Sequence, residues 1–324
     1  MTADKPYGPF KIFLASLMAG LKQLFVSYPQ PEFPKQLGDY HWVSNITKHG
    51  PKKSYPIALY HDHKGEKAFA KLSSSRIKGY HYHSLKNEIN LYTALNSVIV
   101  RTKYSQIKIP QLLKVAETSN HLLMLIEFID GQTAESLSPR QKVKLYFQVT
   151  DSLGTLGNLM NTTEKSLVSK RSPLDIAFLH PLLLFRSIVN YPTRALDLIK
   201  CSLVFFRNFR DLKKTFSYRL VHRDLHFANV ILKGKRTTLI DLQQCVFTDP
   251  IQEHVTLLRY FWKDGNFYKL FLKKLHALIP SHSDPHAFQA LMSNSVIHGL
   301  TDKAFSAETI ANWFDFLNYA VNYG

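Results

Sequence analysis

The chain has 324 residues, of which 45% are hydrophobic and 20% charged, a composition that excludes disorder and supplies a large core. It carries 41 basic and 24 acidic residues, a formal net charge of +17, which predicts an anionic partner unless the basic surface serves solubility alone. Its two cysteines, Cys201 and Cys245, exclude a disulfide framework or a zinc cluster and indicate a reducing compartment.

The first segment expected is residues 1–36, an amphipathic helix followed by a proline-rich connector. Apolar side chains in residues 10–25 fall on one helical face, and Lys11 and Lys22 interrupt the run. The uninterrupted stretch is shorter than the ~20 residues that cross a bilayer. No small-residue cleavage site follows it, so a signal peptide is not expected. The helix is predicted either to pack on the body of the protein or to lie on a membrane surface.

Residues 37–129 are predicted to form an antiparallel sheet with one helix. Short β-prone runs separated by turn clusters indicate a meander, and further strands follow the helix. The strands are expected at 40–46, 55–60, 68–72, 111–116 and 121–129, and the helix at 84–95. Residues 122–126 are all apolar, so the last of these strands is expected to be buried.

Residues 130–324 are predicted to form a mainly helical second lobe, which begins at the hinge-like Asp130-Gly131. Helices are expected at 139–160, 174–189, 194–216, 254–278 and from 285 to the end, with a β-rich island at 219–242. This order predicts an α+β fold with two lobes. The helix at 194–216 is basic and amphipathic, and either packs on the body or binds anionic lipid.

The β-rich island holds three polar groups in a pattern that suits phosphoryl transfer. Asp224 and Asn229 lie five residues apart on one loop, and Asp241 ends the strand that follows. A carboxylate can orient an attacking hydroxyl and accept its proton. An amide and a second carboxylate supply the hard oxygen ligands that magnesium prefers beside a triphosphate. Pairing of the two strands is expected to bring these groups together.

This pattern resembles the catalytic loop and metal-binding aspartate of the protein-kinase-like superfamily. His226, two residues after Asp224, makes it similar to the aminoglycoside phosphotransferase and choline kinase branch in particular. The resemblance implies the bilobal protein-kinase-like fold, with ATP and Mg²⁺ as cofactors. It also implies Asp224 as catalytic base and Asn229 and Asp241 as magnesium ligands. Arg223 departs from the branch, which usually has glycine there.

The resemblance assigns nucleotide-binding roles to residues nearer the N-terminus. Lys71, in a strand-like run, is expected to hold the α- and β-phosphates, and Glu88, 17 residues later, to orient it. The segment from Glu127 to Ile129 resembles the hinge that binds adenine through its backbone. The chain has no glycine-rich phosphate loop, and the turn at 47–54 either contacts phosphate or is only a basic surface turn.

Several residues around the motif receive secondary interpretations. His222 is expected to brace the loop, and His226 either approaches the substrate or packs. Gln243 and Gln244 are candidates for lining the cleft, and Cys245 for the core. Asp249 and Glu253 are expected to cap the helix that starts beside them.

The function predicted is transfer of the γ-phosphate of ATP to a hydroxyl of a small molecule: a sugar, a nucleoside or a lipid-linked sugar. The basic charge argues against polycationic acceptors. The alternative is an inactive pseudokinase scaffold on an anionic membrane or partner. The absence of an Ala-Pro-Glu segment argues against a protein kinase, and no nucleic-acid partner is expected because no such motif is present. The protein is expected to be cytoplasmic, with peripheral contact at the inner membrane face as an option.

Overall fold

The computed structural model describes residues 32–46, 56–76, 78–282, 284–301 and 306–323, together with Gly8, Ile12, Leu14 and Met18. The turn at 47–54 and most of the expected N-terminal helix lie outside the described residues. Ile12, Leu14 and Met18 are helical, and the last two are exposed. The chain divides into two compact units. The first holds the described residues up to Ala134 with Thr155–Ser169 and Ala228–Cys245, and the second holds Glu135–Gly154, Lys170–Phe227 and Val246–Gly324.

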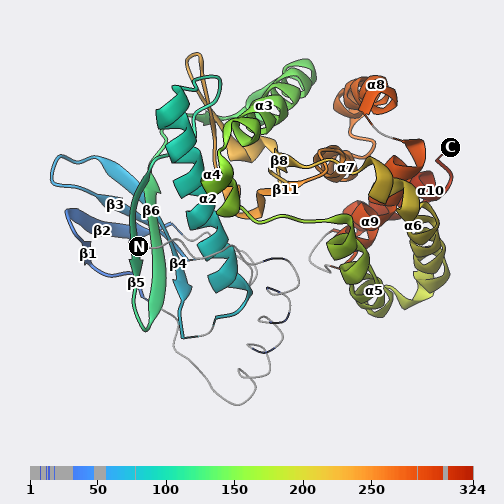
Figure 1. The fold of residues 1–324 in the computed structure, drawn as a ribbon, viewed down its shortest axis with the longest axis horizontal. Coiled ribbons are helices and arrows are strands. Elements are labelled where there is room, and N and C mark those ends of the chain that lie inside the picture. Colours follow the sequence, from blue (N-terminus) through green and yellow to red (C-terminus); the bar gives the residue numbers. More distant parts are fainter. Residues whose placement is uncertain are drawn as a thin grey trace. The chain divides into compact units, whose positions relative to one another are not determined.

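The first unit contains an antiparallel sheet, as predicted, in the order β1-β2-β3-β4-β6-β5, with β1 as a strand that was not predicted (Figure 1). The strands are β1 (Gln36–Leu37), β2 (Tyr40–Asn45), β3 (Ile57–His61), β4 (Lys67–Ser74), β5 (Leu112–Glu117) and β6 (His121–Glu127). The apolar run of β6 is buried, because β6 lies between β4 and β5, helix α2 (Tyr80–Thr102) packs on it, and its other side joins a hydrophobic cluster. One face of this sheet is filled by a compact cluster that includes Tyr60, Leu72 and Leu125.

Helix α2 (Tyr80–Thr102) packs against β4, β5 and β6 (Figure 1). It is longer than the predicted helix at both ends, and it stops where Lys103 adopts a left-handed conformation with φ 54°. Short helix α4 (Thr162–Ser166) begins with a capping box between Asn161 and Glu164, and Glu164 also accepts hydrogen bonds from Ser97 and Arg101 of α2. These contacts fix the position of α2 within the first unit.

A second, three-stranded sheet of the first unit has the order β10-β9-β7. Its strands are β7 (Gln132–Thr133), β9 (Val230–Lys233) and β10 (Arg236–Leu239). Gly131, just before β7, lies against β9 so closely that a Cβ atom would be 2.6 Å from Ile231 Cγ2 and 2.7 Å from Leu232 O. The predicted hinge therefore requires glycine because of close backbone approach.

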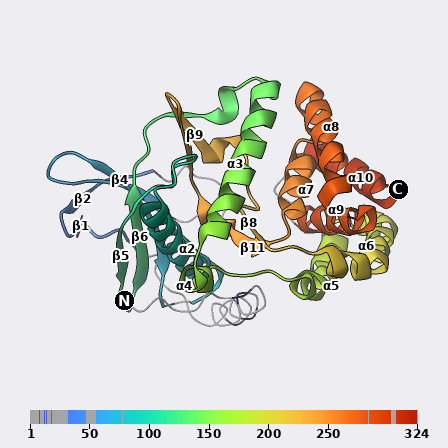
Figure 2. The same ribbon diagram turned by 45° about the horizontal axis from the view of Figure 1, so that its top comes forward.

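The second unit is mainly helical, with one two-stranded sheet (Figures 1 and 2). Its elements are β8 (Arg219–Val221), β11 (Val246–Thr248), the larger part of α3 (Pro139–Leu159), α5 (Pro173–Asn190), α6 (Ala195–Thr215), α7 (Ile251–Tyr260), α8 (Gly265–His282), α9 (Pro285–Gly299) and α10 (Ala307–Val321). The single helix predicted at 254–278 is wrong: Lys263 and Gly265 are left-handed, at φ 62° and 42°, and separate α7 from α8. Strand β11 was not predicted.

The core of the second unit centres on α9, which packs against α5, α6, α7 and α10. His180 of α5 is fully buried, stacks on Phe205 of α6, and shares hydrogen bonds with Ser202 and Asn294. Among the described helices, none combines the length and apolar character needed to cross a bilayer.

Candidate active site

Lys71 is buried in β4 and contacts two carboxylates of the first unit. Its Nζ lies 2.8 Å and 3.1 Å from the two Glu88 oxygens and 2.6 Å from Asp241 Oδ1. The Glu88 side chain is fully buried, whereas that of Asp241 is 42% exposed. The lysine and glutamate that the sequence assigned to phosphate binding are thus brought together, with the aspartate assigned to metal binding at the same amine.

The charges of this group are mutually dependent. Burial alone would lower the pKa of Lys71, but the carboxylates of Glu88 and Asp241 raise it above its ordinary value. Burial raises the pKa of Glu88, and the Lys71 ammonium opposes that rise. Lys71 therefore stays protonated and offers a fixed positive charge for anionic ligands.

Beside this group the first unit has a cavity of about 240 Å³. Its walls are largely apolar and include a few polar side chains, which is the usual character of a small-molecule site. The lining residues are Ile57, Phe69, Lys71, Pro110, Ile126, Glu127, Phe128, Ile129, Asn229, Ile231, Ile240 and Asp241. All predicted nucleotide and metal residues of this unit line it except Glu88, which contacts Lys71 instead.

The apolar walls of the cavity were not predicted. Phe69 stands two residues before Lys71 on β4, so strand alternation places both on one face, and this signal was available in the sequence. Ile231 and Ile240 come from β9 and the residue after β10, and no local pattern marks them as ligand contacts.

Asn229 and Asp241 are held at one end of the β9–β10 hairpin. Val230 pairs with Leu239, and the Ile240 N–H donates to Asn229 O at 2.9 Å, so the two residues flank the same end of the paired strands, as predicted. Asp241 is left-handed, with φ 56°, a strained conformation for a residue with a side chain. Two oxygen donors on neighbouring backbone segments fit a hard divalent cation that is completed by phosphate oxygens.

Asp224 belongs to the second unit, on the loop after β8. The residue before it, Arg223, has φ 64°. Glu253 of α7 accepts hydrogen bonds from the N–H groups on both sides of Asp224: its Oε2 from Arg223, and its Oε1 from Leu225 at 3.1 Å. The carboxylate of Glu253 therefore braces the loop that presents Asp224.

The expectation that Glu253 caps the following helix is wrong, because its carboxylate faces the loop. Burial raises the pKa of Glu253 to about 7, against the effect of the N–H groups of Arg223 and Leu225, while the charge of Asp224 adds to the rise. Asp249 does cap: it accepts the Ile251 N–H at 2.9 Å, and also the Ser217 N–H at 3.0 Å.

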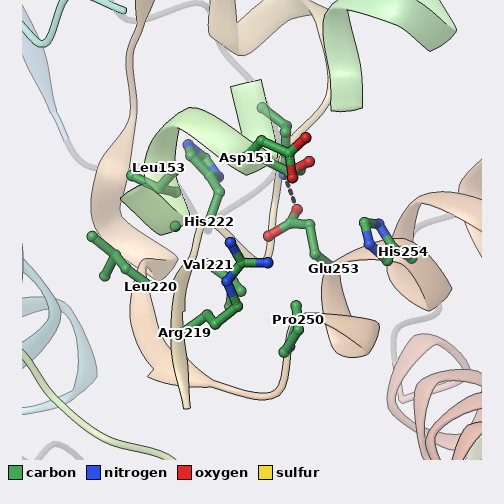
Figure 3. A pocket seen from close by; sticks show the side chains of 12 residues that line it. Asp151, Leu153, Arg219, Leu220, Val221, His222, Pro250, Glu253 and His254 are labelled. Carbon is green, nitrogen blue, oxygen red and sulfur yellow. Dashed lines mark hydrogen bonds between the residues drawn. The ribbon is translucent and has the colours of Figure 1, made fainter. Parts of the chain in front are cut away.

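A small cavity of about 30 Å³ lies behind this loop, and Asp151, Arg219 and Glu253 point toward it (Figure 3). Arg219 packs on Gly154, and a Cβ atom added at this glycine would lie 2.9 Å from the Arg219 guanidinium. The space matches one or two water molecules. It is too small for a sugar or nucleoside, so we do not assign the acceptor to it.

The remaining candidates occupy varied environments. His222 is buried and His226 half-buried, and their roles stay predictions. Gln244 donates to Tyr80 Oη at 2.9 Å at the start of α2. Cys201 and Cys245 are buried and form no disulfide, and the burial of Cys245 agrees with its expected place in the core.

Comparison with known proteins agrees with this site. The profile of the Phosphotransferase enzyme family (APH) matches residues 59–291. This match spans well over half of the chain, and the protein belongs to that family. It is therefore a small-molecule phosphotransferase that acts on an alcohol group. No curated protein sequence matches the chain.

Solved structures with the same fold are distant in sequence. Aminoglycoside phosphotransferase APH(4)-Ia, in a complex with AMP-PNP and hygromycin B, has a TM-score of 0.61 at 14% identity and covers 89% of this chain and 94% of its own. Amicoumacin kinase hAmiN, with AMP-PNP and Ca²⁺, has 0.54 at 12%, covering 97% and 96%. Spectinomycin phosphotransferase APH(9)-Ia, with ADP and spectinomycin, has 0.52 at 11%, covering 86% and 88%. The bilobal kinase-like fold expected from the sequence is confirmed.

Proposed function

We propose that the protein transfers the γ-phosphoryl group of ATP to a hydroxyl of a sugar, a nucleoside or a lipid-linked sugar. The observation that carries this is the Lys71–Glu88–Asp241 group, of which Lys71 and Asp241 line the 240 Å³ cavity. The apolar walls of that cavity suit a planar base, and the Lys71 ammonium suits phosphates. A nucleotide is therefore the ligand class that best matches the cavity.

In this proposal each residue of the nucleotide site has a separate task. Lys71, oriented by Glu88, binds the α- and β-phosphates. The backbone of Glu127–Ile129 contacts the base. The N–H groups of Glu127 and Phe128 already donate to Gln111 O and Lys67 O, which leaves the carbonyls and the Ile129 N–H for this contact.

Asn229 and Asp241 are the residues that would hold Mg²⁺. When bound, the ion supplies charge neutralisation at the phosphates. Among the described residues no group of three or more histidine, cysteine or acidic side chains could hold a metal alone. Two protein oxygens completed by phosphate oxygens is the usual arrangement for Mg²⁺.

Asp224 orients the acceptor hydroxyl and takes its proton. The acceptor oxygen forms the new bond to the γ-phosphorus as the bond from that phosphorus to the β-bridging oxygen breaks, and ADP leaves with the electron pair. Glu253 holds the loop so that the Asp224 carboxylate is presented in one orientation. The presence of all these groups favours an enzyme over the pseudokinase scaffold.

The test is ADP release by purified protein with Mg²⁺ across sugars, nucleosides and lipid-linked sugars. One acceptor should stimulate turnover, and Asp224→Asn should reduce it by about 10²- to 10⁴-fold, the usual contribution of a catalytic base. Nucleotide binding should survive that change. A wild type that binds no nucleotide with or without Mg²⁺ would refute the proposal and leave the scaffold.

We also propose peripheral contact with an anionic membrane, at its inner face. The support is the outward side of α5 and α6, two helices that pack side by side (Figures 1 and 2). Both helices expose large apolar side chains at intervals of three and four residues, on the side opposite their buried residues. These are Leu174, Phe178, Leu182, Phe185 and Val189 on α5, and Leu196, Ile199, Leu203 and Phe206 on α6.

Charge favours lipid over a second copy as the partner of this surface. The exposed side of α6 becomes basic beyond Phe206, with Arg207, Arg210, Lys213 and Lys214. An apolar face bordered by basic residues suits the interface of an anionic bilayer. A second copy would bring like charges together in a protein whose formal charge is already +17.

Vesicle co-sedimentation tests this contact. The wild type should bind vesicles with phosphatidylglycerol and not neutral ones, and Phe185→Ser with Leu196→Ser should abolish binding. Val100→Ser, which changes an exposed apolar residue of α2, is the control. Equal binding by the double variant, or self-association through this face, would contradict the proposal.

A further inference from the structure

Strand β4 presents an aromatic side chain to the cavity of about 240 Å³ in the first unit. Phe69 lines this cavity together with Lys71, which stands two residues further along the strand. The two neighbours of Phe69, Ala68 and Ala70, are fully buried in the hydrophobic cluster on the other face of the sheet. Phe69 is only half-buried, although β4 has a paired strand on each side. Its ring is therefore open to the cavity instead of being enclosed by packed side chains.

The pairing of β4 with β6 sets where Phe69 stands along the cavity. Phe69 pairs with Ile126, which directly precedes the Glu127–Ile129 segment that is proposed to contact the base. Lys71 pairs with Met124, further from that segment. Two residues of a strand span about 7 Å, so Phe69 stands one such step from Lys71, on the side of the base-binding segment. In a nucleotide, the ribose separates the base from the α-phosphate by a comparable distance.

A second sheet of the first unit completes the apolar lining. Ile231 of β9 and Ile240, the residue after β10, line the same cavity as Phe69. The contact between Lys71 Nζ and Asp241 Oδ1, at 2.6 Å, joins the two sheets next to these residues. The cavity therefore offers a slot for a flat ligand, with the Phe69 ring from one sheet and branched aliphatic side chains from the other.

We infer that Phe69 stacks on the base of the phosphoryl donor and selects purine over pyrimidine nucleotides. The inference rests on the proposed function, in which this cavity binds the nucleotide. Bases stack on aromatic side chains through their ring faces, so this contact does not read the hydrogen-bonding edge of the base. A purine has two fused rings and covers more of the Phe69 ring than a pyrimidine does. ATP and GTP should therefore gain equally from Phe69, and CTP and UTP should gain less.

The first test is nucleotide binding measured by calorimetry with Mg²⁺ and without an acceptor. Phe69→Leu keeps an apolar side chain but removes the ring. It should weaken the binding of ATP and GTP by about 5- to 150-fold, the usual effect of losing a stacked aromatic ring. Affinity for CTP should fall by a smaller factor, and affinity for inorganic tripolyphosphate, which has no base, should not change. Phe69→Tyr, which retains the six-membered ring, should bind ATP like the wild type.

Phe33→Leu is the matched control, because it makes the same change on the opposite face of the same sheet. Phe33 is also half-buried, and it packs on Tyr60 and the hydrophobic cluster there. This variant should lose thermal stability without a change in nucleotide affinity. Equal losses of ATP, CTP and tripolyphosphate affinity in Phe69→Leu would show that Phe69 only supports the fold. Unchanged ATP affinity would show that the base does not lie on its ring, and either result overturns the inference.

Fluorescence of Phe69→Trp detects the stacked base directly. The chain has three native tryptophans, so the signal of the introduced indole is the difference between the spectra of variant and wild type. ATP and GTP should quench this signal, because a base in contact with an indole ring quenches its emission, and tripolyphosphate should not. An introduced indole that remains unquenched at ATP concentrations that saturate the protein by calorimetry would contradict stacking.

Turnover distinguishes failure of this inference from failure of the proposed function. Phe69→Leu should raise KM for ATP more than it lowers kcat, and the preference for ATP over CTP in kcat/KM should shrink, because the ring contacts the base and not the reacting phosphate. Wild-type turnover whose preference for ATP over CTP persists in Phe69→Leu overturns the role of Phe69 and leaves the kinase intact. Purine binding that depends on Phe69, in a protein that no acceptor stimulates, supports the stack and refutes the proposed function.

Discussion

Glu253→Gln tests whether the Glu253 carboxylate sets the position of the loop that carries Asp224, the proposed catalytic base. The two Glu253 oxygens accept N–H groups from Arg223 and Leu225, on either side of Asp224. Glutamine keeps the size of the side chain but has only one acceptor oxygen. One backbone N–H would then face an amide N–H, and that side of the loop would move away.

The sizes of the effects follow from these contacts. Loss of one hydrogen bond to a charged group costs about 1.5–3 kcal/mol. If this is expressed as misplacement of Asp224, kcat falls by about 10- to 100-fold. Stability should change little at pH 8, because the rise of the Glu253 pKa from 4.5 to about 7 represents roughly 3 kcal/mol of charge burial that glutamine removes.

The assay is ADP release with whichever acceptor the screen of sugars, nucleosides and lipid-linked sugars selects, together with urea unfolding at pH 8. The exposed Glu308→Gln is the control, since it removes the same charge far along the chain from the loop. Nucleotide affinity should be unchanged in both variants. A Glu253→Gln protein with wild-type kcat would refute the bracing role. A protein that lost activity only because it unfolds would show that removing the buried charge does not offset the lost hydrogen bond.

Three further outcomes are expected. Because the pKa of Glu253 is raised in the folded protein, the folded protein holds a proton between pH 4.5 and about 7 that the unfolded chain releases. The contribution of Glu253 to the free energy of unfolding should therefore fall as pH rises through this range. In urea unfolding, Glu253→Gln should accordingly show a flatter dependence of stability on pH than the wild type. Lys71→Met should abolish turnover and destabilise the protein by about 3–5 kcal/mol, because Glu88 and Asp241 lose their counter-charge. Adding Glu88→Leu to this variant should restore the melting temperature but not the activity. A double variant whose melting temperature does not recover would contradict this reasoning. Gly131→Ala should cost about 1–3 kcal/mol of stability by forcing the chain away from β9, whereas Gly8→Ala, in open space, should cost nothing; equal melting temperatures would disprove the close approach.

The sequence alone determined the elements and groups whose signals are local. Alternating apolar strands and the continuous apolar run of β6 predicted the antiparallel sheet, because burial imposes that period directly on the chain. The pairing of Asn229 with Asp241 followed from one hairpin, whose strands are separated by a short turn. Lys71 and Glu88 were found by their order and spacing within a strand and the next helix.

What the sequence did not determine depends on contacts between distant segments. Glu253 looked like a helix cap because only its place near a helix start was visible, whereas its partners lie about thirty residues earlier. The break between α7 and α8 depends on two left-handed residues, Lys263 and Gly265, and only glycine gives a sequence signal for that conformation.

The same holds for the two buried arginines. Arg171 and Arg259 stand on separate segments, and no motif links them. The net charge showed that the protein is basic, but charge counts do not distinguish an exposed lysine from a buried arginine. Arg259 is buried against α9 and Trp313, and Arg171 is buried where its backbone pairs with β11. Tertiary structure therefore decided which positive charges lose their contact with water, because desolvation is a property of the fold.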